Sequence, residues 1–272
     1  ELGKKGIVSK VKVVGTKSSN NQILASKVSS LSEKLGYSAD VEYYPKGNND
    51  KDSYKKVIEE ARSNSCVIIS TPDSTHYDIA KFVLNNDFDC LVVKPLSATV
   101  NEVKQLIELK NSKNKIGLVE FHKRWDRCNL KIKDLIQNDK IGDPVYSIVE
   151  YSQRISIPTV SFKNWVKGTN IFQYLGVHYV DMIYFCTGYL PIRTMAVGQK
   201  TVLYKKGVNT YDSIQAVTEW LDKKTGNIFT SVIITNWIDP NTSSSMSDQK
   251  IKFIGSEGRI ESNQKNRGLE VT

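Results

Sequence analysis

Residues 66–95 decide the fold, with the sequence CVIISTPDSTHYDIAKFVLNNDFDCLVVKP. Two short apolar runs, at 66–70 and 90–94, enclose a helix-length segment at about 74–86. This order of elements is typical of a βαβ unit in a parallel sheet. Neither run alternates apolar with polar residues, so we expect helices to cover both faces of the sheet.

The same rhythm continues on both sides of this unit. It predicts an α/β domain with a parallel sheet over residues 1–121. The further expected strands are 10–16, 40–44 and 116–121, and the further expected helices are about 21–35, 51–63, 97–111 and, after the last strand, 126–138.

Beyond Gly142 the pattern changes to long alternating strands joined by tight turns, which favours an open, mostly antiparallel sheet with one solvated face. Residues 122–272 therefore form a second domain in this interpretation, with one helix at about 171–187. Glycines at 223–227 and 255–258 are expected to supply the positive φ of two hairpin turns. The expected strands are 145–157, 213–222, 227–237, 250–255 and 258–262.

The composition is that of a water-soluble globular protein, with 39% hydrophobic and 25% charged residues in 272. No run approaches the ~20 apolar residues of a membrane span, and the N-terminus lacks a signal peptide, so we expect a cytoplasmic protein without a membrane partner. The net charge of +9 comes from scattered lysines, and no aromatic residues interleave with basic clusters, so we expect no nucleic-acid partner. The four cysteines lie far apart, without metal spacing, which predicts buried, reduced thiols and no metal site.

Polar residues collect where the predicted strands end, and in parallel α/β sheets ligands bind at those ends. Strand 66–70 runs into a loop that leads to His76, strand 90–94 ends in Lys94, and strand 116–121 is followed by His122. Each residue also has a structural explanation. Lys94 could form a salt bridge or extend to solvent, His76 could stabilise the start of its helix, and any of the histidines could be a hydrogen-bonded structural residue.

The helix at 171–187 is apolar nearly all round, which indicates burial. Asn170 and Gln173 form an N-terminal capping signal. Tyr174, His178 and Asp181 lie within about 60° of one another on the helix and form one polar stripe. Buried polar groups need partners, so this stripe faces a core network, a wet cavity or a substrate.

At this point the sequence resembles the Gfo/Idh/MocA oxidoreductases, the glucose–fructose oxidoreductase and inositol dehydrogenase group. The resemblance covers essentially the whole chain. It implies a dinucleotide-binding Rossmann domain at 1–121, a substrate-binding and oligomerisation domain at 122–272, and NAD(P)-dependent oxidation or reduction of a sugar, cyclitol or nucleotide-sugar hydroxyl. The motifs that carry it are STPDSTHYDIA (70–80), LVVKP (91–95), VEFHKRW (119–125), NDKIGDP (138–144) and GVHYVDMIYFCTG (176–188).

The resemblance also implies roles for individual residues. His178 is similar to the family's catalytic histidine, and an imidazole suits proton abstraction from a carbinol near neutral pH. Lys94 resembles the lysine near nicotinamide and substrate, and Tyr174 completes the catalytic set. We expect cofactor contacts from Ser70, Thr71, Pro72, His76, Lys94, Pro95 and His122, and substrate contacts from Arg124, Trp165, Gln173 and Asp181.

The sequence departs from the family pattern in three places. Val93 replaces the usual Glu before the Lys-Pro pair, and Tyr174 stands where many members have Asp. A phenol cannot supply a carboxylate charge, so the alternative is a member that binds a sugar or cofactor without turnover. No G-x-G-x-x-G occurs, so we expect that the chain begins after the first strand and glycine loop, or lacks residues between Gly6 and Val11, and that it also stops short at Thr272.

The segment after strand 10–16 bears on the choice of cofactor. NAD binding favours an acidic residue there, whereas the 2′-phosphate of NADP needs cationic and hydroxyl partners. Lys17 and Ser18 follow this strand without an acid, so the sequence favours NADP over NAD; a solvated loop lysine is the alternative explanation. Family resemblance further implies a homodimer or homotetramer that associates through the open sheet.

Overall fold

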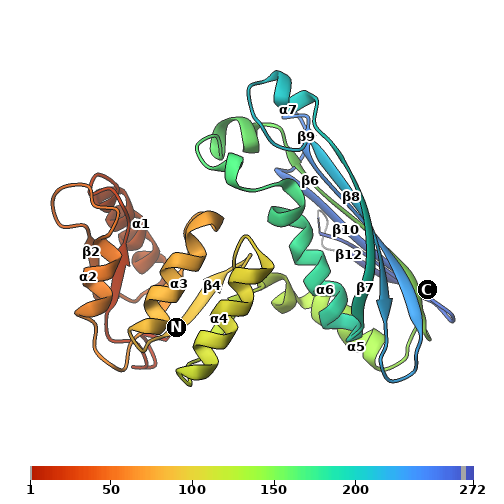
Figure 1. Cartoon of the computed structure of the whole chain (residues 1–272), viewed down its shortest axis with the longest axis horizontal. Helices are drawn as coiled ribbons and strands as arrows, with labels where there is room; N and C mark the ends of the chain where they lie inside the picture. Colours follow the sequence, from red (N-terminus) through yellow and green to blue (C-terminus); the bar gives the residue numbers. More distant parts are fainter. Residues whose placement is uncertain (1, 265–267) are drawn as a thin grey trace. The chain divides into compact units, whose positions relative to one another are not determined.

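The computed structural model describes residues 2–264 and 268–272. These residues form two compact units (Figure 1). The division predicted between residues 121 and 122 stays a prediction. The first unit comprises Glu1–Val67, Ile79–Cys90 and Leu109–Ile116, and the second comprises Ile68–Asp78, Leu91–Glu108 and Gly117–Thr272.

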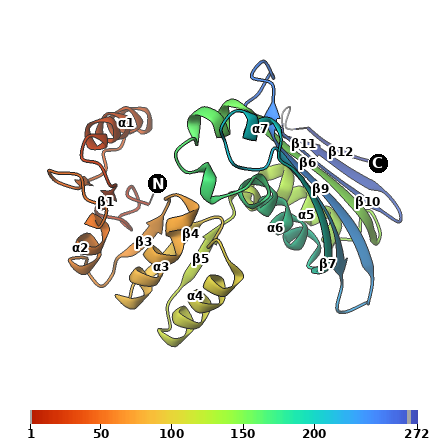
Figure 2. The same cartoon turned by 45° about the horizontal axis from the view of Figure 1, so that its top comes forward.

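The N-terminal strands follow the expected βαβ rhythm. β1 (Val11–Val14) pairs in parallel with β2 (Val41–Tyr44), and α1 (Asn20–Leu35) connects them. After α2 (Ser53–Glu59) comes a three-stranded sheet in the order β3-β4-β5 (Figure 2). Its elements in chain order are β3 (Cys66–Ile69), α3 (His76–Asn85), β4 (Asp89–Val93), α4 (Val100–Ser112) and β5 (Gly117–Glu120).

The expectation that helices cover both faces of this sheet is wrong for β3. Ile69 is 2% exposed, but its neighbour Ile68 points to the other face and is 68% exposed. Cys66, on the same strand, is also exposed, contrary to the expected burial of every thiol. Cys90 and Cys186 are buried, and the described residues contain no disulfide.

The second unit contains a seven-stranded open sheet in the order β12-β11-β10-β6-β9-β8-β7. The described pairings are antiparallel except for β6 with β9. A mostly antiparallel sheet is therefore confirmed. Its strands are β6 (Pro144–Arg154), β7 (Leu190–Gln199), β8 (Ser213–Leu221), β9 (Ile228–Asp239), β10 (Ser247–Gly255), β11 (Arg259–Asn263) and β12 (Gly268–Val271).

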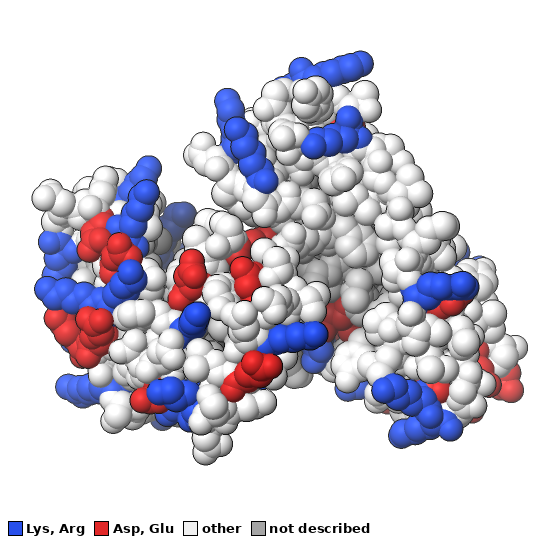
Figure 3. Space-filling model, in the orientation of Figure 1, with Lys and Arg blue, Asp and Glu red and all other residues white. Residues whose placement is uncertain are grey.

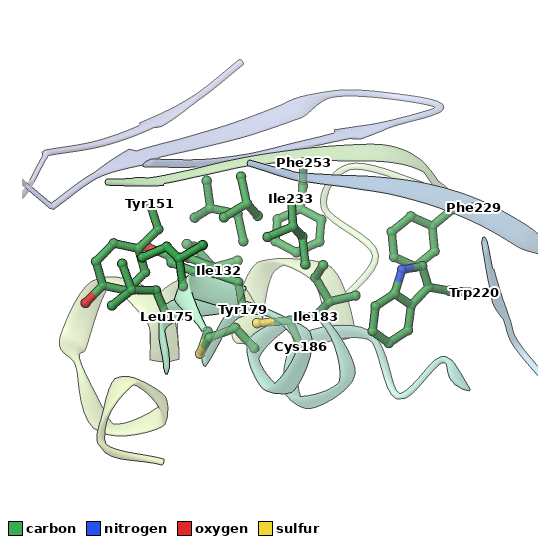
Figure 4. Close-up of a cluster of buried hydrophobic side chains, with 14 of the residues drawn as sticks. Ile132, Tyr151, Leu175, Tyr179, Ile183, Cys186, Trp220, Phe229, Ile233 and Phe253 are labelled. Carbon is green, nitrogen blue, oxygen red and sulfur yellow. The ribbon is translucent and has the colours of Figure 1, made fainter. Parts of the chain in front are cut away.

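Strict alternation along the strands places one face of this sheet in the core. On β9 every second residue from Phe229 to Trp237 is buried, whereas the residues that alternate with them are partly exposed. The buried face packs against α5 (Arg127–Gln137) and α6 (Val177–Thr187), as the cluster around Ile183 shows (Figure 4). This packing fixes the position of α6, and of the side chains that it carries, relative to the sheet.

The helix expected at 171–187 begins differently from the prediction. A π-helical turn, Phe172–Gly176, precedes α6. A Cβ at Gly176 would lie 2.8 Å from atoms of the Phe172 ring, so only glycine allows this close approach. The sequence analysis also missed β7 and β12 and the short helix α7 (Val202–Lys205). β7 is an edge strand that is exposed along most of its length. Because neither of its faces is buried, its sequence shows no alternation of apolar and polar residues that would predict a strand.

One of the two predicted turns requires glycine for a reason other than the expected positive φ. Gly226, between β8 and β9, has a φ of +80°, as predicted. Gly255 and Gly258, between β10 and β11, are not among the described glycines with positive φ. A Cβ at Gly255 would lie 2.0 Å from the backbone oxygen of Ile141, so this position requires glycine for space.

The surface shows the mixed charge that the scattered lysines predict. Basic and acidic side chains are interspersed on the face shown in Figure 3. No helix among the described residues is long and apolar enough to cross a membrane.

Candidate active site

An open cavity of about 450 Å³ lies within the second unit. The elements that meet there are the ends of β3 and β4, the 3-10 turn His122–Trp125, β6, the segment 162–165, the π-helical turn Phe172–Gly176 and α6. Residues distant in sequence thus converge on one site. Its lining residues are Ser70, Thr71, Pro72, Asp73, Val93, Lys94, His122, Tyr151, Gln153, Phe162, Trp165, Tyr174, Leu175 and His178.

Lys94 directly follows β4 and is buried, with 7% exposure. Its Nζ donates a hydrogen bond of 2.5 Å to the backbone oxygen of Tyr174 and lies 3.9 Å from the centroid of the Tyr174 ring. Burial lowers the pKa of Lys94 to about 8, although the charges of Asp73 and Glu120 partly oppose this shift. A lysine with this pKa can give up its proton near neutral pH.

His178 lies in the first turn of α6 and is 3% exposed. Burial, together with the charges of Lys94, Lys123 and His122, lowers its pKa to about 2. Its Nδ1 is buried and has no hydrogen-bond partner among the described residues. A neutral imidazole with an unsatisfied nitrogen beside a cavity can accept a proton from a bound hydroxyl.

Aromatic rings form one wall of the cavity. The Tyr174 ring centroid lies 5.1 Å from that of Phe162 and 5.7 Å from those of Trp165 and Trp237. Burial raises the pKa of the Tyr174 phenol, which therefore stays protonated at neutral pH. The wall offers apolar ring faces for a substrate and one phenolic hydroxyl.

The sequence analysis missed several lining residues that the structure brings into the cavity. Asp73, buried behind the Thr71–Pro72 segment, accepts a hydrogen bond of 3.0 Å from Thr169 Oγ1. Tyr151 and Gln153 lie on the buried face of β6, and the alternation of that strand was a signal that could have identified them. Phe162 and Leu175 had no comparable signal, because they come from irregular turns.

Several expected site residues do not line the cavity. Arg124 is paired with Asp181 through two hydrogen bonds, from Nε at 2.7 Å and from a terminal nitrogen at 2.5 Å. This pairing raises the pKa of Arg124 and satisfies both groups, which makes them a packing link rather than a cavity wall. The backbone nitrogen of Gln173 bonds to Asn170 Oδ1 at 2.9 Å, the capping contact that the sequence predicted.

His76 and Pro95 lie beside the lining residues but not among them. The His76 ring is 1% exposed, and its nitrogens lie 2.7 Å from the Pro95 oxygen and 2.8 Å from the Thr71 oxygen. The ring therefore ties the segment after β3 to the segment after β4. Its expected contact with the cofactor stays a prediction, and the geometry assigns it a supporting position.

Lys17 and Ser18 belong to the first unit. They follow β1 and precede α1, at the carboxyl end of a parallel strand. Lys17 is exposed, and the Ser18 backbone nitrogen bonds to Asn49 Oδ1 at 3.1 Å. Their role toward a cofactor phosphate stays a prediction. In the described residues no group of three or more His, Cys, Asp or Glu side chains is placed to hold a metal ion.

Comparison with known families assigns the chain to a class. Residues 14–121 match the oxidoreductase family with an NAD-binding Rossmann fold, and residues 129–261 match the GFO/IDH/MocA C-terminal domain. The protein therefore belongs to the Gfo/Idh/MocA oxidoreductase family, as the sequence motifs implied.

Individual relatives agree with this assignment. The chain is 24% identical over 218 residues to the inositol 2-dehydrogenase of Rhizobium meliloti, which covers 79% of this chain and 62% of that protein. It is 31% identical over 120 residues to an uncharacterized oxidoreductase of Schizosaccharomyces pombe, which covers 42% of this chain and 31% of that protein. The chain thus spans less than two thirds of the length of both relatives.

Solved structures share the fold. An inositol dehydrogenase homolog from Azotobacter vinelandii, complexed with NADH and myo-inositol, superposes with a TM-score of 0.71 at 16% identity, covering 97% of this chain and 75% of that one. The myo-inositol 2-dehydrogenase of Lactobacillus plantarum also gives 0.71 at 16% identity, covering 93% and 75%.

Proposed function

We propose that this protein is an NAD(P)-dependent dehydrogenase that transfers a hydride between the cofactor and a hydroxyl or carbonyl carbon of a sugar, cyclitol or nucleotide sugar. The observation that carries the proposal is that Lys94 and His178, both buried and both with lowered pKa values, line one cavity. Lys94 orients the substrate oxygen, and His178 takes the hydroxyl proton. Tyr174 donates a hydrogen bond from the aromatic wall, on which a sugar ring can pack.

The residues around the strand ends fit a nicotinamide cofactor. Ser70, Thr71 and Pro72 form an exposed segment after β3, where ligands of parallel sheets bind, and Lys94 lies after the next strand. When bound, the cofactor supplies a hydride acceptor. Lys94, desolvated beside that position, holds the reacting oxygen and excludes water from it.

A fluorescence titration with NADPH and NADH tests this proposal. We expect saturable binding of at least one nucleotide, followed by turnover with a member of a panel that contains myo-inositol, free sugars and nucleotide sugars. Lys94→Ala serves as the control that binds nucleotide but turns over poorly. A folded protein that binds neither nucleotide would contradict the proposal.

A second candidate function is binding of a sugar or cofactor without turnover. The observation that favours it is Tyr174, which places a neutral phenol in the wall of the cavity where many family members have a carboxylate. Tyr174→Asp separates the two functions. A gain of dehydrogenase activity from an inert parent supports binding alone, and the loss of an existing activity excludes it.

We further propose NADP as the preferred cofactor. Lys17→Ala is expected to weaken NADPH binding about tenfold, because one charge-assisted hydrogen bond to the 2′-phosphate is lost, and to leave NADH binding unchanged. Titration of both nucleotides measures the effect. Lys27→Ala, which removes an exposed lysine from α1, is the matched control. Equal losses for both nucleotides would contradict a 2′-phosphate contact.

We also propose that the protein forms a homodimer or homotetramer through the open sheet. The face opposite α5 and α6 exposes Tyr146, Ile148, Met195 and Val197, and such an apolar face is unfavourable in water. We expect Met195→Asp to convert the oligomer to monomers in light scattering without a change in circular dichroism. A wild-type protein that is monomeric at micromolar concentration would contradict this proposal.

A further inference from the structure

Two histidines from different elements meet at the cavity. His122 lies in the 3-10 turn after β5, and His178 lies in the first turn of α6. Their ring centroids are 4.7 Å apart, with the planes inclined at 68°. The chain has three histidines in all, and this contact joins two of them.

The two rings differ in their access to solvent. His178 is 3% exposed, whereas the His122 side chain is 59% exposed. His178 Nδ1 has no hydrogen-bond partner among the described residues, so no described side chain receives a proton from that nitrogen. His122 is therefore the exposed protonatable group in contact with the buried ring.

A carboxylate lies beside the exposed ring of His122. Glu120 Oε2 lies 3.4 Å from His122 Nδ1, at the end of β5. A carboxylate at one imidazole nitrogen orients the ring. The other charged groups near His178 are Lys94 and Lys123, and both oppose a positive charge there.

We propose that His122 is a proton relay, which passes the proton taken up by His178 to solvent with Glu120 as its orienting partner. This inference rests on the proposed dehydrogenase function. Oxidation of a carbinol group breaks its C–H and O–H bonds and forms a C=O bond; the hydride goes to nicotinamide and the proton goes to His178. The same proton moves next to His122 and then to water, so His178 returns to its neutral form for the following turnover.

The geometry suits this transfer. No hydrogen bond joins the rings directly, but their separation allows transfer through one water or after a small ring rotation. A positive charge on His178 is unfavourable because the ring is buried beside two lysines, so the proton moves outward. His122 can pass the proton on to water, because its side chain is 59% exposed.

Proton exchange of the histidine rings tests the relay without any need for turnover. In nitrogen-15 NMR, we expect exchange of the His178 ring N–H with water to slow by about tenfold in His122→Asn relative to the wild type. His76 is the internal control, because its ring is buried with both nitrogens bonded, and its signal is expected to stay unchanged. Unchanged His178 exchange in His122→Asn would overturn the relay.

Buffer rescue gives an independent readout during catalysis. We expect kcat of His122→Asn to fall on the order of tenfold and to recover as the imidazole concentration rises, whereas the wild type stays insensitive. Sodium chloride at equal ionic strength controls for salt, and Glu120→Gln should show a smaller loss of the same kind. A loss that no buffer restores indicates a structural role and overturns the relay. A wild type without turnover contradicts the proposed function instead, and the NMR result then still tests the relay.

Discussion

His178→Asn is expected to lower kcat by about 10²- to 10⁴-fold, the usual contribution of a general base. The neutral imidazole takes the proton of the substrate hydroxyl, and an amide of similar size cannot do so. Steady-state turnover over a saturating range of substrate measures the effect. Because the His178 pKa is about 2, we also expect that protonation of His178 itself causes no loss of kcat/KM near pH 6.5, the ordinary imidazole range.

Two controls separate this catalytic role from a structural one. Nucleotide affinity and the melting temperature of His178→Asn should stay close to the wild type, because no described hydrogen bond is lost at Nδ1. Turnover of His178→Asn at the wild-type rate would remove His178 from the mechanism. A variant that no longer folds would be replaced by His178→Gln, which keeps more of the side-chain volume.

Lys94→Met is expected to lower kcat by about 10²-fold or more and, at neutral pH, to raise the melting temperature. Activity falls because the cation that orients the substrate oxygen is lost. Stability rises because the wild-type fold buries that cation, a cost on the order of a few kcal/mol for a pKa that falls from 10.5 to about 8. Methionine fills a similar volume without a charge.

The pH dependence of stability tests the electrostatic cause. The pKa of Lys94 is lower in the folded than in the unfolded chain, so between about pH 8 and 10.5 the unfolded state binds more protons and the wild type gains stability as the pH rises. The advantage of Lys94→Met is therefore largest below pH 8 and disappears above about pH 10.5. Lys133→Met is a matched control. Lys133 also lies over an aromatic ring, with its Nζ 3.9 Å from the Phe185 centroid, but it does not line the cavity. An equal gain in both variants, or a constant advantage at every pH, would contradict the explanation.

Much of the candidate site could be predicted because its residues follow strands. Ser70, Lys94 and His122 lie at strand ends, and the apolar runs before them identify those ends without a structure. Tyr174 and His178 were found because helical periodicity places them on one face. The same stripe also suggested Asp181, whose expected contact with a substrate stays a prediction. Asp181 does not line the cavity, and periodicity does not reveal that its carboxylate is paired with Arg124.

The sequence by itself determined most of the strands and helices, the parallel class of the N-terminal strands, the mostly antiparallel class of the later sheet and the family, because hydrophobic periodicity and short motifs are local properties of the chain. Tertiary structure alone decided which polar residues are free to act. It pairs Arg124 with Asp181 and holds the His76 ring between two backbone oxygens, and it leaves His178 Nδ1 without a hydrogen-bond partner among the residues that the structure describes. The physical reason is that desolvation and hydrogen-bond partners come from residues distant in sequence, and these set the pKa and the availability of a side chain.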